Sequence, residues 1–340
     1  MEELPKLCVQ ANADSPENNI GEDFLKLMKN IIRRALGSPL SKFLVRKSAA
    51  NLWSRKALNA VYLSLNTKLK TQFHSIFAKI FRDGHYRVEQ GLWRVKFRAK
   101  DILLPLGSEQ IWLEWDVAVS IVGHDTEVKE AYRSLLDSAD RPDVFIDVGT
   151  NYGTHSLLFL VHGIEAISFE PNSSCHAYFQ RLCRVNGVEP NLQHVALGES
   201  EGELDLSYPL RDTWLGSTDV KVKNRLADKG ELVSERVEQR KLDSYLPQLI
   251  GKRALIKIDT EGNEISVLLG AKEVLQRVKP KVIFESWDAS GRAALFDFFD
   301  LREYEIHSLW VKPDPSKQAL AAESFMQSSA QNFIAIPRNA

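Results

Sequence analysis

The sequence predicts an α/β fold with a doubly wound, seven-stranded sheet, and three observations support it. From residue 144 onward, short runs of β-branched and aromatic residues alternate with helix-like segments through short connections. The first run, "VFIDVG", passes through two glycines into a segment with the apolar spacing of a helix. With 340 residues, 44% of them hydrophobic, the chain is long enough for such a domain and a second unit.

Changes in composition divide the chain into four regions. Residues 1–20 are polar and are expected to form a flexible tail. Residues 21–83 form a basic helical region, and residues 84–140 form a small β unit with a linking helix. Residues 141–340 form the α/β domain.

Two of these regions give more detailed predictions. Apolar residues recur every three or four positions along residues 41–81, which predicts one amphipathic helix. The β unit contains the runs "YRVEQGLWRVKF" and "QIWLEWDVAVSIV", with turns expected at Gly91 and Gly107. A helix capped by Asp125 or Thr126 should follow them.

Seven strands are expected in the α/β domain. They are "VFIDVG", "EAISFEP", "NLQHVALG", "ALIKIDTEG", "KVIFESW", "YEIHSLW" and "NFIAIP". A polar segment joins the last two, so one of them should insert antiparallel at the sheet edge. The polar stretch 211–230 is too long for a simple turn and is interpreted as a functional loop at the ligand end of the sheet.

The cysteine spacing and the lack of a signal peptide or membrane span favour a location in a reducing compartment. Cys8, Cys175 and Cys183 are widely spaced, which argues against a disulfide framework or a C-x-x-C metal site. The N-terminus lacks the basic start and apolar core of a signal peptide, and no run approaches the roughly 20 apolar residues of a membrane span. These features predict a cytoplasmic protein, either free or peripheral to a membrane.

The turn after the first strand predicts a nucleotide-like ligand. Glycine permits positive φ and close backbone approach, and N–H groups at a helix start favour an acceptor-rich ligand. The dinucleotide fingerprint has glycine where this turn has Asn151, which weakens an NAD assignment. Glu170 closes the next strand, and a carboxylate there can accept two hydrogen bonds from a ribose diol. S-adenosylmethionine has no pyrophosphate and suits an acid such as Asp147 beside the turn.

Several segments resemble the FkbM-type methyltransferases, a branch of the Rossmann-like class I S-adenosylmethionine-dependent fold. They are "FIDVGTNYGTHSL", "ISFEPNSSCHAYFQRLCRVNGV", "HVALGESEGELDL", "KLDSYL", "IKIDTEGNEISVLLGAKEVL" and "PKVIFES", within about residues 117–290. The resemblance implies methyl transfer to an oxygen of a sugar, glycan or natural product, with S-adenosylhomocysteine as the second product. It does not identify the acceptor.

The resemblance also implies which residues hold the cofactor. Glu170 would hold the ribose diol, and Asp259 would contribute from the ligand end of the fourth strand. The residues framing the methionine end would be Asp147, Gly149, Asn151 and Gly153, and the adenine would lie along Ala196 and Leu197.

A sugar hydroxyl is a poor nucleophile until it loses its proton, so a base is expected near the fourth and fifth strand ends. Glu261 or Asp259 is the first hypothesis, with His124 or His155 as the competitor. Glu264 has a simpler interpretation as an acid at a helix start. No metal site is assigned, although the acids at these strand ends leave Mg²⁺ open.

The 211–230 stretch carries Trp214, Ser217 and Thr218, which are expected to close over the acceptor. The basic segment 24–82, which contains no Asp or Glu, either packs on the α/β domain or attracts an anionic acceptor or membrane surface. Nucleic acid is disfavoured because no recognition motif is present. The alternative function is a Rossmann-type NAD binder, or a non-catalytic interaction module that uses the basic region.

Overall fold

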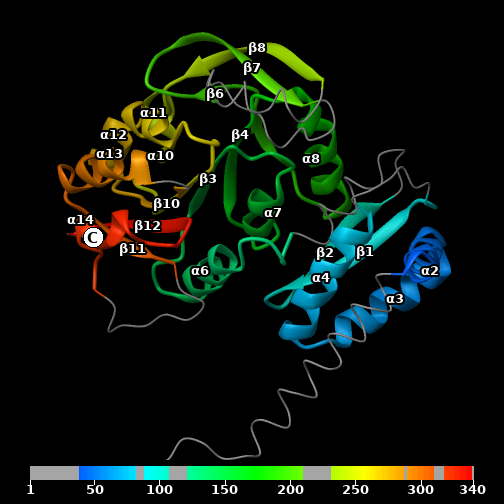
Figure 1. Ribbon diagram of the computed structural model, residues 1–340. Helices are drawn as coiled ribbons and strands as arrows, with labels where there is room; N and C mark the ends of the chain where they lie inside the picture. The colour runs from blue at the N-terminus through cyan, green and yellow to red at the C-terminus, as the bar shows by residue number, and fades with distance from the viewer. Residues whose placement is uncertain are drawn as a thin grey trace, which may run out of the picture.

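A computed structural model describes residues 38–81, 88–106, 121–209, 231–286, 289–309 and 318–338. Its centre is a seven-stranded sheet with the strand order β11-β12-β10-β9-β3-β4-β5 (Figure 1). The strands are β3 Val144–Val148, β4 Glu165–Phe169, β5 Asn191–Gln193, β9 Ala254–Ile258, β10 Lys281–Glu285, β11 Tyr304–Ser308 and β12 Asn332–Pro337. The predicted doubly wound α/β sheet is therefore confirmed.

The antiparallel strand is β12, which lies one place in from the edge, between β10 and β11. Five of its six residues are buried, so both of its faces are covered, and its two edges pair with β10 and β11. In β11 buried and half-buried residues alternate at its start, which suits the outer position.

Alternate residues of the strands face two separate cores. Phe145 points into the core shared with α6, α7 and α8, whereas Ile146 points into the core shared with α10 to α14. The helices on the first side are α6 Thr126–Asp137, α7 Thr154–Leu160 and α8 Ser173–Val185. Those on the second side are α10 Leu246–Leu249, preceded by the 3₁₀ turn Leu242–Tyr245, α11 Glu264–Leu269, α12 Lys272–Arg277, α13 Ala289–Asp300 and α14 Ala322–Met326 (Figure 1).

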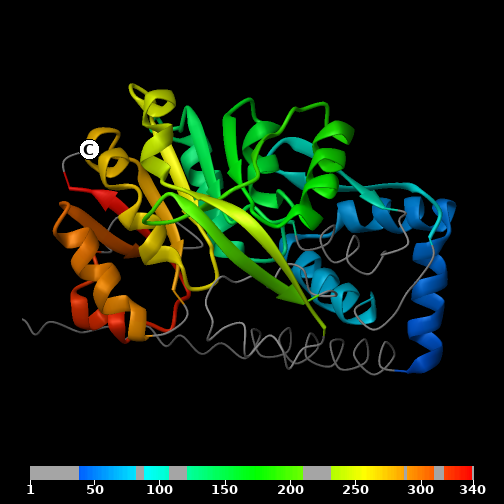
Figure 2. The ribbon, with the colours of Figure 1, turned by 90° about the horizontal axis from the view of Figure 1, so that it is seen from above.

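A smaller, three-stranded sheet follows β5 in the chain and has the strand order β6-β8-β7. The predicted strand at 191–198 is divided, because β5 ends at Gln193 and the chain pairs with β8 instead. The elements are β6 Ala196–Leu197, β7 Gly202–Pro209 and β8 Leu232–Arg240. Figure 2 shows β7 and β8, in green and yellow-green, running side by side across the molecule. The predicted functional loop between them lies outside the described residues.

The single helix predicted for residues 41–81 is wrong, because this segment forms three helices. They are α2 Pro39–Ala50, α3 Leu52–Ser64 and α4 Thr67–Phe81. The Asn51 side chain accepts hydrogen bonds from the amides of Trp53 and Ser54, which starts a new helix. The apolar stripe continues across the second break, between α3 and α4, because the centroids of the Tyr62 and Phe73 rings lie 5.0 Å apart.

The small β unit is a hairpin of β1 Gly91–Phe97 and β2 Lys100–Leu106. Its turn is at Arg98, which has a φ of +54°, and not at Gly91, where a turn was expected. Gly91 begins β1, where an added Cβ would lie 2.5 Å from the Arg55 guanidinium of α3. Gly107 and residues 110–120 of the second predicted run lie outside the described ranges.

The free edge of the hairpin is attached to the α/β domain by Asn186, the residue after α8. Its side chain accepts a hydrogen bond from the Leu103 amide at 2.8 Å and donates one to the Leu103 carbonyl at 2.7 Å. Apolar contacts continue from the N-terminal helices and hairpin into the core around α6 to α8. No helix in the described ranges is both long and apolar enough to cross a bilayer. The domain limits at residues 83 and 140 stay predictions.

Asn186→Ala should lower the free energy of unfolding by about 1–3 kcal/mol, because the two Leu103 backbone groups lose their partner. Urea denaturation measures this change. Asn191→Ala is the matched control, since that side chain is exposed and its change should stay within about 0.5 kcal/mol. Equal effects of the two substitutions would contradict the role given to Asn186.

Candidate functional site

The turn after β3 depends on two glycines that lie close to other parts of the chain. Gly149 has a φ of +80°, and an added Cβ would lie 1.8 Å from the carbonyl oxygen of Asp259 after β9. Gly153 has a φ of +76°, and its Cβ would lie 1.9 Å from the Phe179 ring of α8. The first glycine brings the ends of β3 and β9 together, and the second allows α7 to pack against α8.

Glu170, at the end of β4, links two turns through both of its oxygens. Oε2 accepts a hydrogen bond from the Asn151 amide at 2.6 Å, and Oε1 accepts one from the Asn172 amide at 2.8 Å. Burial raises the pKa of Glu170 to about 7, although the two amide bonds oppose the shift. Each carboxylate oxygen can accept a further bond, so this acid still suits the diol role predicted for it.

Asp147 lies beneath the turn and is fully buried. Its Oδ2 accepts hydrogen bonds from the Ser156 amide at 3.0 Å and the Ser156 hydroxyl at 2.7 Å, which fixes the start of α7. Its Oδ1 has no hydrogen-bond partner, and burial raises the pKa of Asp147. This geometry supports the turn from below rather than the direct framing of a ligand predicted from the sequence.

A buried ion pair occupies the neighbouring strand. Lys257 lies within β9 and is 2% exposed, and its Nζ is 2.7 Å from Oδ2 of Asp259. Burial alone would lower the pKa of Lys257, but the carboxylates of Asp259 and Asp147 raise it above its ordinary value. One side of the Asp259 carboxylate is therefore engaged by a cation.

A second group of charged residues comes from the start of α6. Lys129 is buried and donates a hydrogen bond to the His124 carbonyl at 2.6 Å. Burial lowers the pKa of Lys129 to about 8, against the opposing effect of Asp125. The exposed His124 ring places Nδ1 3.1 Å from Oδ2 of Asp125, a hydrogen bond that raises the pKa of His124. The negative charge of Asp259 also raises this pKa.

His155 of α7 lies beside the same group. Its Nδ1 is 2.9 Å from the Tyr132 hydroxyl, and its Nε2 is 4.0 Å from Oδ2 of Asp125. Burial, followed by the charges of Lys129 and Lys257, holds the pKa of His155 well below its ordinary value. The ring is therefore neutral at physiological pH and is a weak base.

The "DTEGNE" segment forms a tight loop after β9. Oε1 of Glu264 accepts hydrogen bonds at 3.1 Å from the amides of Thr260 and Gly262 and from the Thr260 hydroxyl. Glu264 thus shapes the loop, as its simpler interpretation proposed. Glu261 stays half-exposed and has a φ of +53°, a conformation that costs a non-glycine residue about 1–3 kcal/mol.

Ala196 and Leu197 are both buried in β6. The next residue, Gly198, packs against the "VLLGA" segment, where a Cβ on Gly270 would lie 2.0 Å from the Gly198 carbonyl oxygen. This close backbone contact fixes β6 against the start of α12. Adenine contact by Ala196 and Leu197 stays a prediction.

Comparison with known proteins now identifies the family. Residues 147–315 match the model of the methyltransferase FkbM domain. This part of the chain is an FkbM methyltransferase domain. The expected resemblance is confirmed, and the domain contains both the turn after β3 and the "DTEGNE" loop.

A curated relative, hexuronic acid methyltransferase AglP from Haloferax volcanii, is 29% identical over 152 residues. The match covers 44% of this chain and 59% of the relative, so the chain spans about three fifths of that protein's length. Among solved structures, methyltransferase FkbM from Methylobacillus flagellatus KT is 15% identical with a TM-score of 0.37, over 68% of this chain and 56% of that one. A SAM-dependent methyltransferase from Agrobacterium tumefaciens is 12% identical with a TM-score of 0.38, over 75% and 74%.

The FkbM domain and α6 bring most of the predicted residues to one edge of the sheet. Asn151, Glu170 and Asp259 follow the adjacent strands β3, β4 and β9. Sequence reasoning missed Lys257 and Lys129. A lysine inside the apolar run "ALIKI" signals a buried ion pair, and Lys129 shares a helical face with Asp125 and Tyr132.

Two points from the sequence remain, the substrate loop and the Mg²⁺ that the acids left open. Trp214, Ser217 and Thr218 lie outside the described residues. In the part of the chain that the structure describes, no group of three His, Cys, Asp or Glu side chains could hold a metal ion. Magnesium assistance therefore has no structural support.

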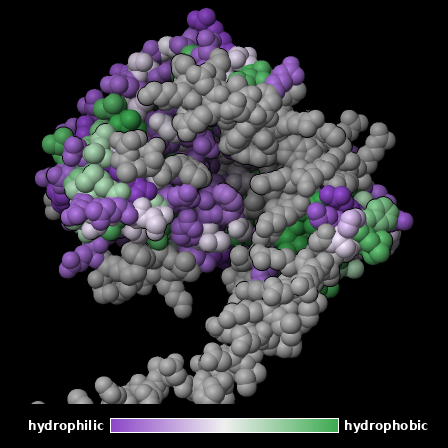
Figure 3. Space-filling view, viewed as in Figure 1, coloured by the Kyte–Doolittle hydropathy of each residue, from purple (hydrophilic) through white to green (hydrophobic). Residues whose placement is uncertain are grey.

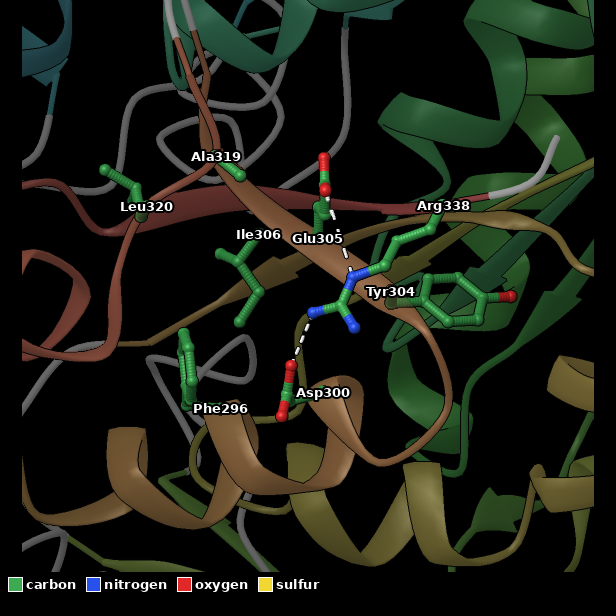
Figure 4. Close-up of a pocket in the computed structure, with 8 residues that line it drawn as sticks. All are labelled: Phe296, Asp300, Tyr304, Glu305, Ile306, Ala319, Leu320 and Arg338. Carbon is green, nitrogen blue, oxygen red and sulfur yellow. Dashed lines mark hydrogen bonds and ion pairs between the residues drawn. The ribbon is translucent and has the colours of Figure 1, made fainter.

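A separate pocket lies at the outer strand β11 (Figure 4). Its polar rim is Arg338, which pairs with Asp300 and lies 3.8 Å from Glu305. The other lining residues are Phe296, Tyr304, Ile306, Ala319 and Leu320. The pocket is lined by β11, which is three strands away from β9 in the sheet. It is therefore separate from the candidate site at the ends of β3, β4 and β9.

Gly153→Ala should destabilise the protein by about 2–5 kcal/mol, because strain at positive φ adds to overlap with Phe179. Gly163→Ala is the matched control, since Gly163 has a φ of +72° but nothing within 4 Å of an added Cβ. The control should lose only about 1–2 kcal/mol. Urea unfolding of both variants checks the difference, and equal losses would argue against close packing at Gly153.

Proposed function

We propose that the protein transfers the methyl group of S-adenosylmethionine to an oxygen of a sugar, with hexuronic acid glycans as the first acceptor class. The observation that carries this proposal is the convergence of the turn after β3, Glu170 and Asp259 at the edge of the FkbM domain. S-adenosylmethionine would supply a methyl group already activated on a sulfonium. The protein must then bind the cofactor and the sugar, orient the acceptor hydroxyl toward the methyl group, and remove the proton of that hydroxyl.

The residues present fit this cofactor. Glu170 would accept the ribose hydroxyls through the lone pairs that its two amide bonds leave available. Asp259, 29% exposed, would attract the ammonium of the methionine end. The side chain of Asn151 occupies the position at which a dinucleotide fold needs glycine against the pyrophosphate, which disfavours NAD.

The acceptor class is supported by the similarity to a hexuronic acid methyltransferase. A hexuronic acid offers two kinds of oxygen to a methyl donor. Its carboxylate is already anionic at neutral pH, whereas a hydroxyl needs a base. We favour a hydroxyl, because a histidine–carboxylate pair lies at the same edge of the domain.

His124 is the base that the geometry favours among the four candidates. Its Nδ1 faces Asp125, which leaves Nε2 of an exposed ring to accept a proton. A raised pKa brings a histidine close to the pH at which general bases are most effective. Asp259 is paired with Lys257, and His155 is buried and bonded to Tyr132, so Glu261 is the remaining competitor.

Affinity for S-adenosylhomocysteine should be up to about tenfold weaker at pH 6 than at pH 8. The folded pKa of Glu170 is raised to about 7, so the carboxylate that accepts the diol forms only as the pH rises through that value. Calorimetric titration across this range measures the change. Glu170→Ala should bind weakly at every pH and lose the pH dependence, and NAD should not bind. Tight binding of NAD would reject the cofactor assignment.

His124→Gln and Asp125→Asn should each lower kcat by about 10²–10⁴-fold while leaving S-adenosylhomocysteine affinity unchanged. Labelled methyl transfer to a panel of hexuronides measures turnover. His307→Gln is the matched control, since His307 pairs with Glu305 at 3.7 Å on the outer strand.

The competing assignment predicts a different pattern. If Glu261 is the base, Glu261→Gln should lose turnover to the same extent and His124→Gln should retain it. Full activity of both variants would remove the requirement for a base and would indicate that the acceptor oxygen is already anionic.

A further inference from the structure

The helices α2 and α3 expose large apolar side chains that the methyltransferase fold does not use. Six of the ten large hydrophobic residues exposed in the described ranges lie on α2, α3 and α4, and Trp53 is the most exposed of these six, at 77%. Figure 3 shows apolar surface beside hydrophilic surface over α2 and α3. The side chains on these two helices are Leu40, Phe43, Leu44, Trp53 and Val61.

The exposed residues follow the helical repeat, so they form a face. In α3 the buried side is Arg55, Asn59 and Tyr62. The other side carries Trp53, Lys56, Ala57, Ala60 and Val61. All five are exposed, and steps of three or four positions connect them along one side of the helix. In α2 the same spacing relates Leu40, Phe43, Leu44 and Lys47. Each helix therefore has one face packed on the protein and a second apolar face toward solvent.

The charged side chains of α2 and α3 are all basic, and the nearby acid Glu89 is engaged by the Leu52 amide at the start of α3. Nζ of Lys56 lies 5.3 Å from the centre of the Trp53 ring, and Nζ of Lys47 lies 6.0 Å from the centre of the Phe43 ring. Between residues 24 and 82 the sequence contains no acidic residue. Aromatic rings with adjacent ammonium groups are suited to a lipid head-group layer, where the ring enters the boundary and the cation meets phosphate.

We propose that this exposed face of α2 and α3 docks on an anionic bilayer surface. Phe43 and Trp53 enter the head-group boundary, and Lys47 and Lys56 contact lipid phosphates. A second copy of the chain is disfavoured because a symmetric contact would place cations against cations. An acidic polysaccharide would satisfy the lysines but would leave Leu40, Leu44 and Trp53 in water. The proposal does not depend on methyl transfer.

The first test is sedimentation of the full chain with vesicles. Vesicles of equimolar phosphatidylcholine and phosphatidylserine should bind the protein, and vesicles of phosphatidylcholine alone should not. Added salt should weaken binding because it screens the lysines. The pair Lys47→Glu and Lys56→Glu should reduce partitioning at least about tenfold, and Phe43→Ser with Trp53→Ser should reduce it similarly.

A matched control uses the same kinds of substitution elsewhere on the surface. Leu301 is 81% exposed and Lys272 is exposed, and both lie in the α/β domain. Leu301→Ser with Lys272→Glu should leave vesicle binding unchanged. Circular dichroism confirms that each variant is folded, which is expected because the substituted side chains contact solvent.

The second test places Trp53 at the lipid. Vesicles with brominated acyl chains should quench part of the tryptophan emission, and Trp53→Phe should remove the quenched component. Binding without quenching, displaced by polygalacturonate, would overturn the proposal in favour of an acidic glycan. A dimer in sedimentation velocity that Trp53→Ser dissociates would overturn it in favour of self-association. Equal vesicle binding by the charge-reversed variant would also overturn it.

Discussion

The candidate site is organised around one buried charge, the ammonium of Lys257 in the middle of the sheet. A cation so fully removed from water persists only if carboxylates lie beside it. The Asp259 carboxylate pairs with this ammonium directly, and the charge of Asp147 on β3 stabilises it further. The same positive field helps to keep His155 neutral. The cation in β9 therefore influences the protonation of groups that reach the site from several elements.

Backbone contacts fix these charges in place. Gly149 lies directly against the Asp259 carbonyl, and Glu170 joins the turn after β3 to the turn after β4. The ends of β3, β4 and β9 are consequently fixed by contacts with one another. A ligand bound across this edge would meet a surface that is already ordered, and this lowers the entropy cost of binding.

The sequence predicts the sheet well because most of its strands are short apolar runs bounded by turn residues. It predicts Glu170 and the glycine turn for the same local reasons. It does not predict the break at Asn51, where a polar cap interrupts an otherwise continuous helical stripe. The orientation of Asp147 also escaped prediction, because Ser156, which holds its carboxylate, is nine residues further along the chain. The His124–Asp125 pair is adjacent in sequence, but its relation to Asp259 depends on how α6 packs on the sheet.

The position of β12 also constrains the order in which the sheet can form during synthesis. Among the described strands, β11 pairs only with β12, and β12 also covers one edge of β10. While the ribosome is still adding residues before Pro337, β10 has an open edge and β11 has no partner. Such edges are the usual starting points for aggregation of incomplete chains. The α/β domain therefore completes its sheet only after β12 has been made, and truncation inside β12 would expose two strands at once.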